Sequence, residues 1–237
     1  MLQACLNGGR NRDFHSALPL SADELAADAS AVIMEGAQQI HLHVRSRDGQ
    51  ESLHPDDVAR TIGAVRVAVP DVPIGLSTGW WIMPRGRARQ EHIRGWQTLP
   101  DYVSINLIEE DSAEVIELAL SKGVGVEAGI WSAADAEKFI AHPCANDCLR
   151  VLIEINEQDL FVGMEAYRAI MAILDRAGIR LPRLLHGLDA TMWDFHREAL
   201  ARGLDGRIGL EDGKHLPDGT VAGDNAALIR AARALAG

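Results

Sequence analysis

The sequence predicts an α/β fold, a compact single (β/α)8 TIM barrel with short loops, in which residues 1–237 form one catalytic domain. A short apolar run rich in β-branched residues, a polar turn and a helical segment recur eight times along the chain. The length of 237 residues lies near the short end of the usual range for this fold. The alternative, an open doubly wound sheet, would require a Gly-rich phosphate loop after the first strand, and the sequence has none there.

Each unit can be placed from its apolar run and from the residues that begin or end its helix. The first helix opens at Ser21 with Glu24 three residues later, a capping box, and ends at Gly36. We expect strands at residues 2–6, 39–45, 74–77, 102–106, 124–127, 149–155, 183–186 and 207–211. We expect the other helices at residues 55–69, 87–96, 111–123, from 132, 163–178, up to 203, and 226–235.

The composition limits the possible partners. The chain carries 34 acidic and 23 basic residues, and its net charge of −11 argues against binding to nucleic acid or to an anionic membrane. It contains neither an apolar run of about 18 residues nor a basic, cleavable leader, so we expect no membrane span, no signal peptide and a cytoplasmic location. The three cysteines fit reduced thiols rather than a disulfide framework.

A metal site is predicted on the second strand. His41 and His43 lie two residues apart and therefore point to the same face of a strand, where two neutral imidazoles can share one zinc ion. The alternative is that both are hydrogen-bonded histidines of the core or rim. The two residues alone do not separate these interpretations.

Polar residues at the carboxyl ends of the predicted strands favour the metal site, because chemistry in this fold collects at that end. A catalytic zinc needs a third protein ligand. Glu211 is the best candidate because a barrel places the eighth strand beside the first and close to the second, although Glu127 and Glu154 compete for this role. Asp212 is a candidate general base near the metal.

A segment rich in tryptophan and arginine follows the third strand. This segment forms a loop at the catalytic face, where the guanidinium groups of Arg85, Arg87 and Arg89 can bind the phosphates of CoA or an anionic substrate. The indoles of Trp80 and Trp81 can stack on a ring or line the pocket. The alternative is a solvated loop in which the tryptophans make a subunit contact.

Short motifs along about the whole chain match one known family. They are Leu6-Asn-Gly-Gly9, Gly36-Ala37, His41-Leu-His-Val-Arg45, Asp48-Gly49, Leu76-Ser-Thr-Gly79, Glu127, His186-Gly187, Arg207-Ile-Gly-Leu-Glu-Asp212 and Asn225. The most specific are HxHxR after Gly-Ala and RxGxED near the end. This set resembles the β-keto acid cleavage enzymes, whose type member cleaves 3-keto-5-aminohexanoate in lysine fermentation.

The resemblance implies a zinc-dependent homo-oligomeric barrel that condenses a β-keto acid with acetyl-CoA, giving acetoacetate and a new acyl-CoA. It implies one Zn2+ per chain, held by His41, His43 and Glu211, with Asp212 as the base and Arg207 orienting it.

The resemblance also implies the substrate contacts. Ser77 and the residue ending the fourth strand, Asn106, would hold the substrate carboxylate. The further substrate contacts would be Asn7, Thr78 and His186, and Glu127 would lie at the active-site mouth. From its own position, His186 fits a hydrogen-bonded rim histidine equally well.

Three departures from the family and two other hypotheses accompany this interpretation. Family members are typically some tens of residues longer, and both Arg10 and the stretch that ends the fourth strand differ from the usual pattern.

The shorter chain implies shorter loops at the rim of the barrel, where CoA would lie. This favours a second hypothesis, a CoA-independent, metal-dependent aldolase, lyase or hydrolase acting on a small keto acid. A non-catalytic scaffold that keeps the barrel is the other hypothesis, and the complete set of candidate ligands and acid–base groups argues against it.

Overall fold

The computed structural model describes residues 1–236, in which eight parallel strands close into a barrel in chain order. The strands are β1 (Leu2–Cys5), β2 (Gln39–Leu42), β3 (Ile74–Ser77), β4 (Tyr102–Asn106), β5 (Gly125–Ile130), β6 (Arg150–Ile155), β7 (Arg183–Gly187) and β8 (Asp205–Ile208). The closing pair, β8 with β1, joins Gln3 to Arg207 and Ala4 to Ile208. The predicted fold class is therefore confirmed.

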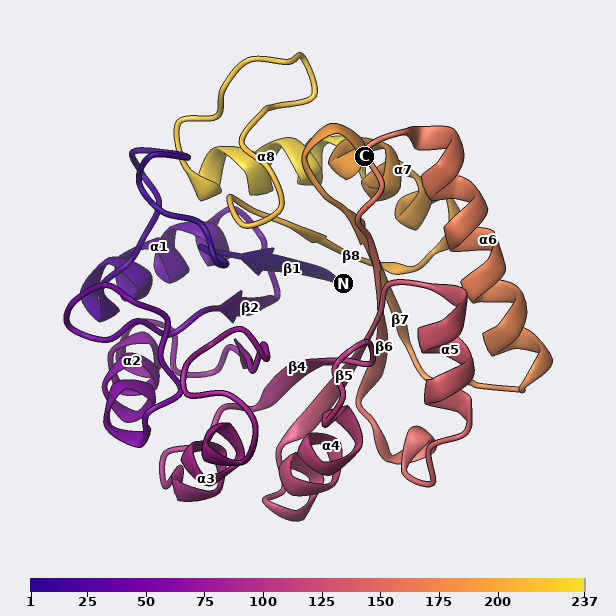
Figure 1. Ribbon diagram of the computed structural model, residues 1–237. Helices are drawn as coiled ribbons and strands as arrows, with labels where there is room; N and C mark the ends of the chain where they lie inside the picture. Colours follow the sequence, from indigo (N-terminus) through magenta and orange to yellow (C-terminus); the bar gives the residue numbers. More distant parts are fainter. Residues whose placement is uncertain (237) are drawn as a thin grey trace.

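Eight α-helices surround the strands as an outer ring (Figure 1). They are α1 (Ala22–Met34), α2 (Pro55–Ala68), α3 (Arg87–Gly95), α4 (Ser112–Ser121), α5 (Ala133–Ile140), α6 (Leu160–Arg176), α7 (Met192–Arg202) and α8 (Asn225–Leu235). Two short 3-10 helices lie between them, η1 (Ala145–Asp147) and η2 (Asp189–Thr191). None of the helices in residues 1–236 has the length and apolar character that crossing a membrane requires.

The helix boundaries follow local capping chemistry. The capping box predicted for α1 is present: Ser21 accepts a hydrogen bond from the backbone of Glu24, whose side chain accepts one from the backbone of Ser21. Gly203 ends α7 in the left-handed conformation, at a φ of 65°. The expected start of α6 at residue 163 was wrong, because Asp159 accepts from the backbone N–H of Val162 and the helix therefore begins at Leu160.

The last strand is shorter than expected and this places the candidate ligand in a loop. We expected Glu211 to end the strand, but β8 stops at Ile208. A Cβ on Gly209 would lie 1.8 Å from the carbonyl oxygen of Cys5, so only glycine permits this approach to β1. Beyond it the chain leaves the sheet, with Glu211 and Asp212 in the turn over the barrel.

The apolar core lies between the outer faces of the strands and the helices, whereas a polar layer crosses the barrel interior. Within this layer the Oε1 atom of Glu127 accepts a hydrogen bond from Nε2 of Gln3 at 2.8 Å and lies 2.8 Å from Nε of Arg150. The phenol of Tyr102 donates to the carbonyl of Ile40 at 2.7 Å. The expectation that Glu127 lies at the active-site mouth was wrong, because β5 continues three residues beyond it and leaves it fully buried.

Two glycines make a matched test of the packing inside and outside the barrel. A Cβ on Gly75 would lie 2.0 Å from the ring of Tyr102, so Gly75→Ala must displace that ring from the polar layer and should cost roughly 1–3 kcal/mol of unfolding free energy. Gly63→Ala lies in α2 with open space around it and should gain roughly 0.5–1 kcal/mol. Urea titrations of both variants measure this; equal stabilities would contradict the packing described.

Candidate active site

Three metal-binding side chains converge at the carboxyl end of the barrel. His41 belongs to β2, His43 follows its last residue, and Glu211 comes from the turn after β8. Nε2 of His43 lies 3.3 Å from Oε1 of Glu211, and Nε2 of His41 lies 3.8 Å from Oε2. One ligand atom from each residue lies within 4.8 Å of the others, which brings together the set expected from the sequence.

The two imidazoles differ in protonation: His41 is ready to bind a metal, whereas His43 must first lose a proton. Burial lowers the pKa of His41 to about 3 and keeps its ring neutral. Burial also opposes charge on His43, but Glu211 and Glu51 outweigh it and raise the pKa of His43 to about 9. The Oε1 atom of Glu51 lies 2.5 Å from Nδ1 of His43, which leaves Nε2 turned toward Glu211.

The donor set fits a divalent cation with a preference for nitrogen and oxygen ligands. Among the described residues, the buried Oε2 of Glu211 has no hydrogen-bond partner, nor has Nδ1 of His41. An unpaired buried carboxylate oxygen is costly unless a cation neutralises it. Two imidazoles and one carboxylate are a donor set of catalytic zinc sites, which keep a further position open.

A second cluster of charges lies beside these residues. Arg207 donates from Nη2 to Oε1 of Glu211 at 2.7 Å and to Oδ1 of Asp212 at 2.8 Å. The thiol of Cys5 donates to Oδ2 of Asp212 at 2.8 Å. Burial alone would raise the pKa of Asp212, but Arg207 and His186 outweigh it and hold this pKa well below its usual range.

His186 lies between two carboxylates. Its Nδ1 is 3.5 Å from Oδ1 of Asp212, and its Nε2 is 3.4 Å from Oε2 of Glu154. Burial and Arg207 oppose protonation, but the two carboxylates raise the pKa of His186 to about 9. A protonated imidazole at this position links the buried Asp212 to Glu154, which lines the pocket.

The pocket above these groups has a volume of about 180 Å³. Of the residues expected to contact substrate, Ser77 and Asn106 line it. Asn7 instead pairs with the backbone N–H and C=O of His43 at 2.9 Å each, and Thr78 donates to the backbone of Ser104 at 2.8 Å. Asn7 and Thr78 are fully buried, and these bonds hold the ends of β2 and β3 in place.

Of the three arginines expected to bind phosphate after β3, the structure excludes one, Arg89. Arg85 and Arg87 are exposed and line no part of the metal pocket, so their assignment to CoA phosphates stays a prediction. Arg89 cannot serve this role because it is fully buried, and its guanidinium donates to Glu109 at 2.7 Å and to Asp111 at 2.9 Å. This buried ion pair ties the segment after β3 to the turn after β4.

Sequence reasoning missed several residues that line or support the pocket. Glu51 was missed although Asp48-Gly49 signals a tight turn, and this turn pairs Arg45 with Glu51 as an antiparallel bridge. Arg10 and Trp131 also line the pocket. Nε of Arg10 donates to the carbonyl of Glu211 at 3.2 Å, a contact across the barrel seam that no local pattern predicts.

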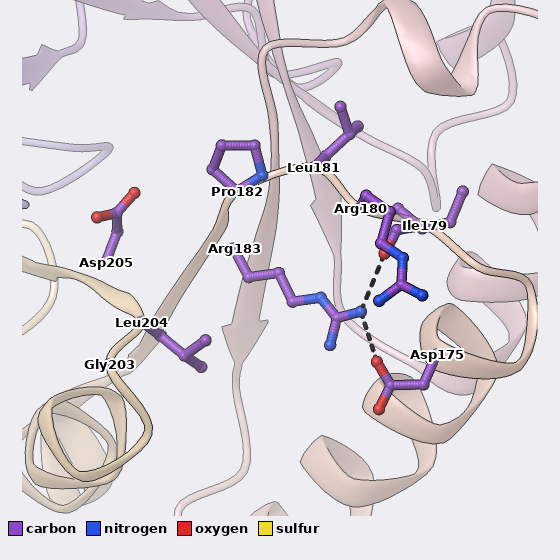
Figure 2. Close-up of a pocket in the computed structure, with 9 residues that line it drawn as sticks. All are labelled: Asp175, Ile179, Arg180, Leu181, Pro182, Arg183, Gly203, Leu204 and Asp205. Carbon is purple, nitrogen blue, oxygen red and sulfur yellow. Dashed lines mark hydrogen bonds and ion pairs between the residues drawn. The ribbon is translucent and has the colours of Figure 1, made fainter.

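Another cavity lies at the opposite end of the barrel, and the described residues that line it include no group of metal ligands like that of the candidate site (Figure 2). It measures about 440 Å³ and lies between the segments that precede β7 and β8. The Nη2 atom of Arg183 there donates to Asp175 at 2.6 Å and to the carbonyl of Ile179 at 3.3 Å, so its charge is already paired. In this fold the amino ends of the strands serve stability, and we place no chemistry there.

A buried amide connects the loop of Glu211 to α1. Nδ2 of Asn225 donates to Asp28 at 2.7 Å and to the carbonyl of Leu6 at 2.8 Å, and its Oδ1 accepts from the N–H of Leu210 at 2.7 Å. Burial raises the pKa of Asp28 to about 7, although the bond from Asn225 opposes this shift. The position of the loop therefore depends on a carboxyl group that titrates near neutral pH.

Comparisons with known proteins agree on one family. The family model described as beta-keto acid cleavage enzyme (BKACE) matches residues 1–237. The 3-keto-5-aminohexanoate cleavage enzyme of Fusobacterium nucleatum is 37% identical over 68 residues, 29% of this chain and 25% of that protein. The 3-oxoadipate:acetyl-CoA acetyltransferase of Cupriavidus necator is 36% identical over 70 residues, 30% of this chain and 24% of that protein. These alignments thus span about a quarter of each relative.

Solved structures share the barrel. ObcA in a ternary complex with a C4-CoA adduct and oxalate superposes with a TM-score of 0.71 at 15% identity, over 92% of this chain and 63% of ObcA. The 3-dehydroquinate dehydratase of Aquifex aeolicus gives a TM-score of 0.58 at 10% identity, over 99% of this chain and 96% of that one. At these identities the likeness establishes the fold alone.

The raised pKa of Asp28 makes stability depend on pH. Between about pH 4 and pH 7 the folded chain holds a proton on Asp28 that the unfolded chain has lost, so stability falls as pH rises through this window. Asp28→Asn keeps the acceptor for Asn225 and removes this titration. We expect the variant to gain roughly 1–3 kcal/mol relative to wild type between about pH 5 and pH 8 in urea titrations. The exposed Asp23→Asn is the control, and parallel pH profiles for the Asp28 variant and wild type would refute the assignment.

Proposed function

Because this chain belongs to the β-keto acid cleavage enzyme family, we propose that it condenses a β-keto acid with acetyl-CoA to give acetoacetate and a new acyl-CoA. The observation that carries the proposal is the convergence of His41, His43 and Glu211 beside the ion-paired Arg207 and Asp212. A relative named as an acetyl-CoA acetyltransferase and an ObcA complex that holds a CoA adduct support the acyl donor. The small pocket supports a small keto acid as the substrate.

We assign His41, His43 and Glu211 as the ligands of one Zn2+ per chain. A zinc ion held by these residues would stabilise negative charge on the keto oxygen as a Lewis acid. The two imidazoles favour zinc over magnesium or calcium, which prefer oxygen ligands.

The chain's own residues would then bind and deprotonate the substrate. Ser77 and Asn106 line the pocket and would hold the carboxylate, with Nδ2 of Asn106 oriented by Glu109 at 3.3 Å. Asp212 would take the proton from the carbon between the ketone and the carboxylate. Its contacts with Arg207 keep it ionised and fixed in position, at a cost in basicity.

The remaining steps exchange the acyl groups. The carbanion formed at that carbon attacks the acetyl thioester and releases CoA as a thiolate. The thiolate then attacks the original ketone, and cleavage of the adjacent carbon–carbon bond releases acetoacetate and leaves the substrate's acyl group on CoA. Each step conserves the atoms of the two substrates, and the proton taken by Asp212 is returned to acetoacetate.

A CoA-independent aldol cleavage or hydrolysis of a small keto acid is the second candidate. It is favoured by the position of the arginine segment, because neither Arg85 nor Arg87 lines the pocket and Arg89 is buried. The cytoplasmic location and the homo-oligomer expected from the sequence stay predictions in either case.

Metal content and a coupled assay test the ligands and the reaction together. We expect about one zinc per purified chain and its loss in the His41→Ala/His43→Ala double variant, because one carboxylate alone holds zinc weakly. Acetoacetate should form from a β-keto acid only when acetyl-CoA is present. The control is His54→Ala/His92→Ala, a second histidine pair with ring centroids 5.3 Å apart and no part in the pocket. Turnover without acetyl-CoA would favour the second candidate, and equal zinc in both double variants would refute the ligand assignment.

Deuterium exchange distinguishes Asp212 from Glu154 as the general base. Asp212→Asn should slow enzyme-dependent exchange of the substrate's α-protons in D2O by about 10²–10⁴-fold, because it removes the base. Glu154→Gln keeps Asp212 and should retain most of this exchange. Proton NMR without acetyl-CoA measures the rate above the uncatalysed background. The reverse order of effects would assign the base to Glu154, which lines the pocket directly.

A further inference from the structure

Two cavities meet at one side chain at the catalytic end of the barrel. The first is the metal pocket of about 180 Å³. The second, of about 410 Å³, is lined by Gly9, Asn11, Arg45, Gly49, Gln50, Glu51, Trp81, Ile82 and Met83. Within residues 1–236, only Gly9 and Trp81 line both. Since glycine has no side chain, the indole of Trp81 is the side chain common to the walls of both cavities.

The indole is held in place from three directions. Its Nε1 donates to Oε2 of Glu51 at 3.1 Å. Its ring stacks on His43, with centroids 6.3 Å apart and planes inclined at 23°. A Cβ on Gly79 would lie 2.4 Å from the ring, so this position admits only glycine if the indole stays where it is.

Glu51 connects this wall to the candidate ligand. Its second oxygen, Oε1, lies 2.5 Å from Nδ1 of His43, so a single carboxylate orients both the imidazole and the indole. Trp81 is half-buried, and an aromatic ring held by a hydrogen bond and by stacking has few rotamers open to it. Trp81 is therefore a rigid wall rather than a mobile loop residue.

We propose that Trp81 determines the length of the β-keto acid that the enzyme accepts, by closing the metal pocket off from the second cavity. The proposal rests on the proposed function. A keto acid bound with its carboxylate at Ser77 and Asn106 shares about 180 Å³ with the acetyl group, which leaves room for a short side chain. Removing the indole would join this space to a cavity more than twice as large, with apolar walls at Ile82 and Met83.

The test compares Trp81→Ala with Trp80→Ala. Trp80 is adjacent in sequence and of the same type, but it is exposed and lines neither cavity. The probes are 3-oxopentanoate and 3-oxodecanoate, bound to the zinc-loaded proteins in calorimetry and turned over with acetyl-CoA. We expect Trp81→Ala to raise the preference for the long acid over the short one at least about tenfold in affinity and in kcat/KM. Trp80→Ala should keep the wild-type preference.

The two readouts separate this proposal from the reaction. A wild-type protein that binds 3-oxopentanoate but shows no turnover with acetyl-CoA contradicts the proposed function, and the affinity ratio still tests Trp81. An unchanged ratio in Trp81→Ala, with zinc content and melting temperature retained, overturns the role of Trp81. If Trp81→Ala does not fold or loses zinc, Trp81→Leu makes a smaller opening, and its affinity ratio then decides. Failure of both acids to bind wild type and variants refutes both proposals.

Discussion

The candidate site depends on the buried guanidinium of Arg207. Glu211 and Asp212 are adjacent carboxylates, Asp212 fully buried and Glu211 half-buried, and their mutual repulsion would disfavour ionisation of both. Arg207, only 3% exposed, donates to both of them, so the two negative charges share one positive charge. His43, whose pKa is raised to about 9, adds a second positive charge beside Glu211. Removing one partner of such a buried network leaves an uncompensated charge, which is costly.

The barrel interior supports this charge cluster with further polar contacts instead of the branched apolar residues usual in this fold. The layer of Gln3, Glu127 and Arg150 lies within the barrel, where Gln3 pairs with Arg207 across the seam between β1 and β8. Apolar packing is left to the outer faces of the strands. Stability and chemistry are thus separated by the alternation of side chains along each strand.

Local patterns predicted what depends on local chemistry. The eight units and the Ser21 capping box followed from periodicity and caps, and His41 and His43 were placed together because side chains two apart share a strand face. Glu127 was misplaced because its depth depends on where β5 ends, which pairing with both neighbouring strands decides.

Arg89 and Glu51 show the same limit. The partner of Arg89 lies 20 residues away and that of Glu51 lies 8 residues away, each across a turn whose geometry cannot be predicted from hydrophobic periodicity.

The closure of β8 on β1 has a consequence for biosynthesis. His41 and His43 leave the ribosome long before Glu211, and β8, the strand that precedes Glu211, pairs with β1. A nascent chain therefore lacks the third proposed ligand until β8 and the turn after it have been translated, so the proposed metal site is complete only after β8 has closed the barrel.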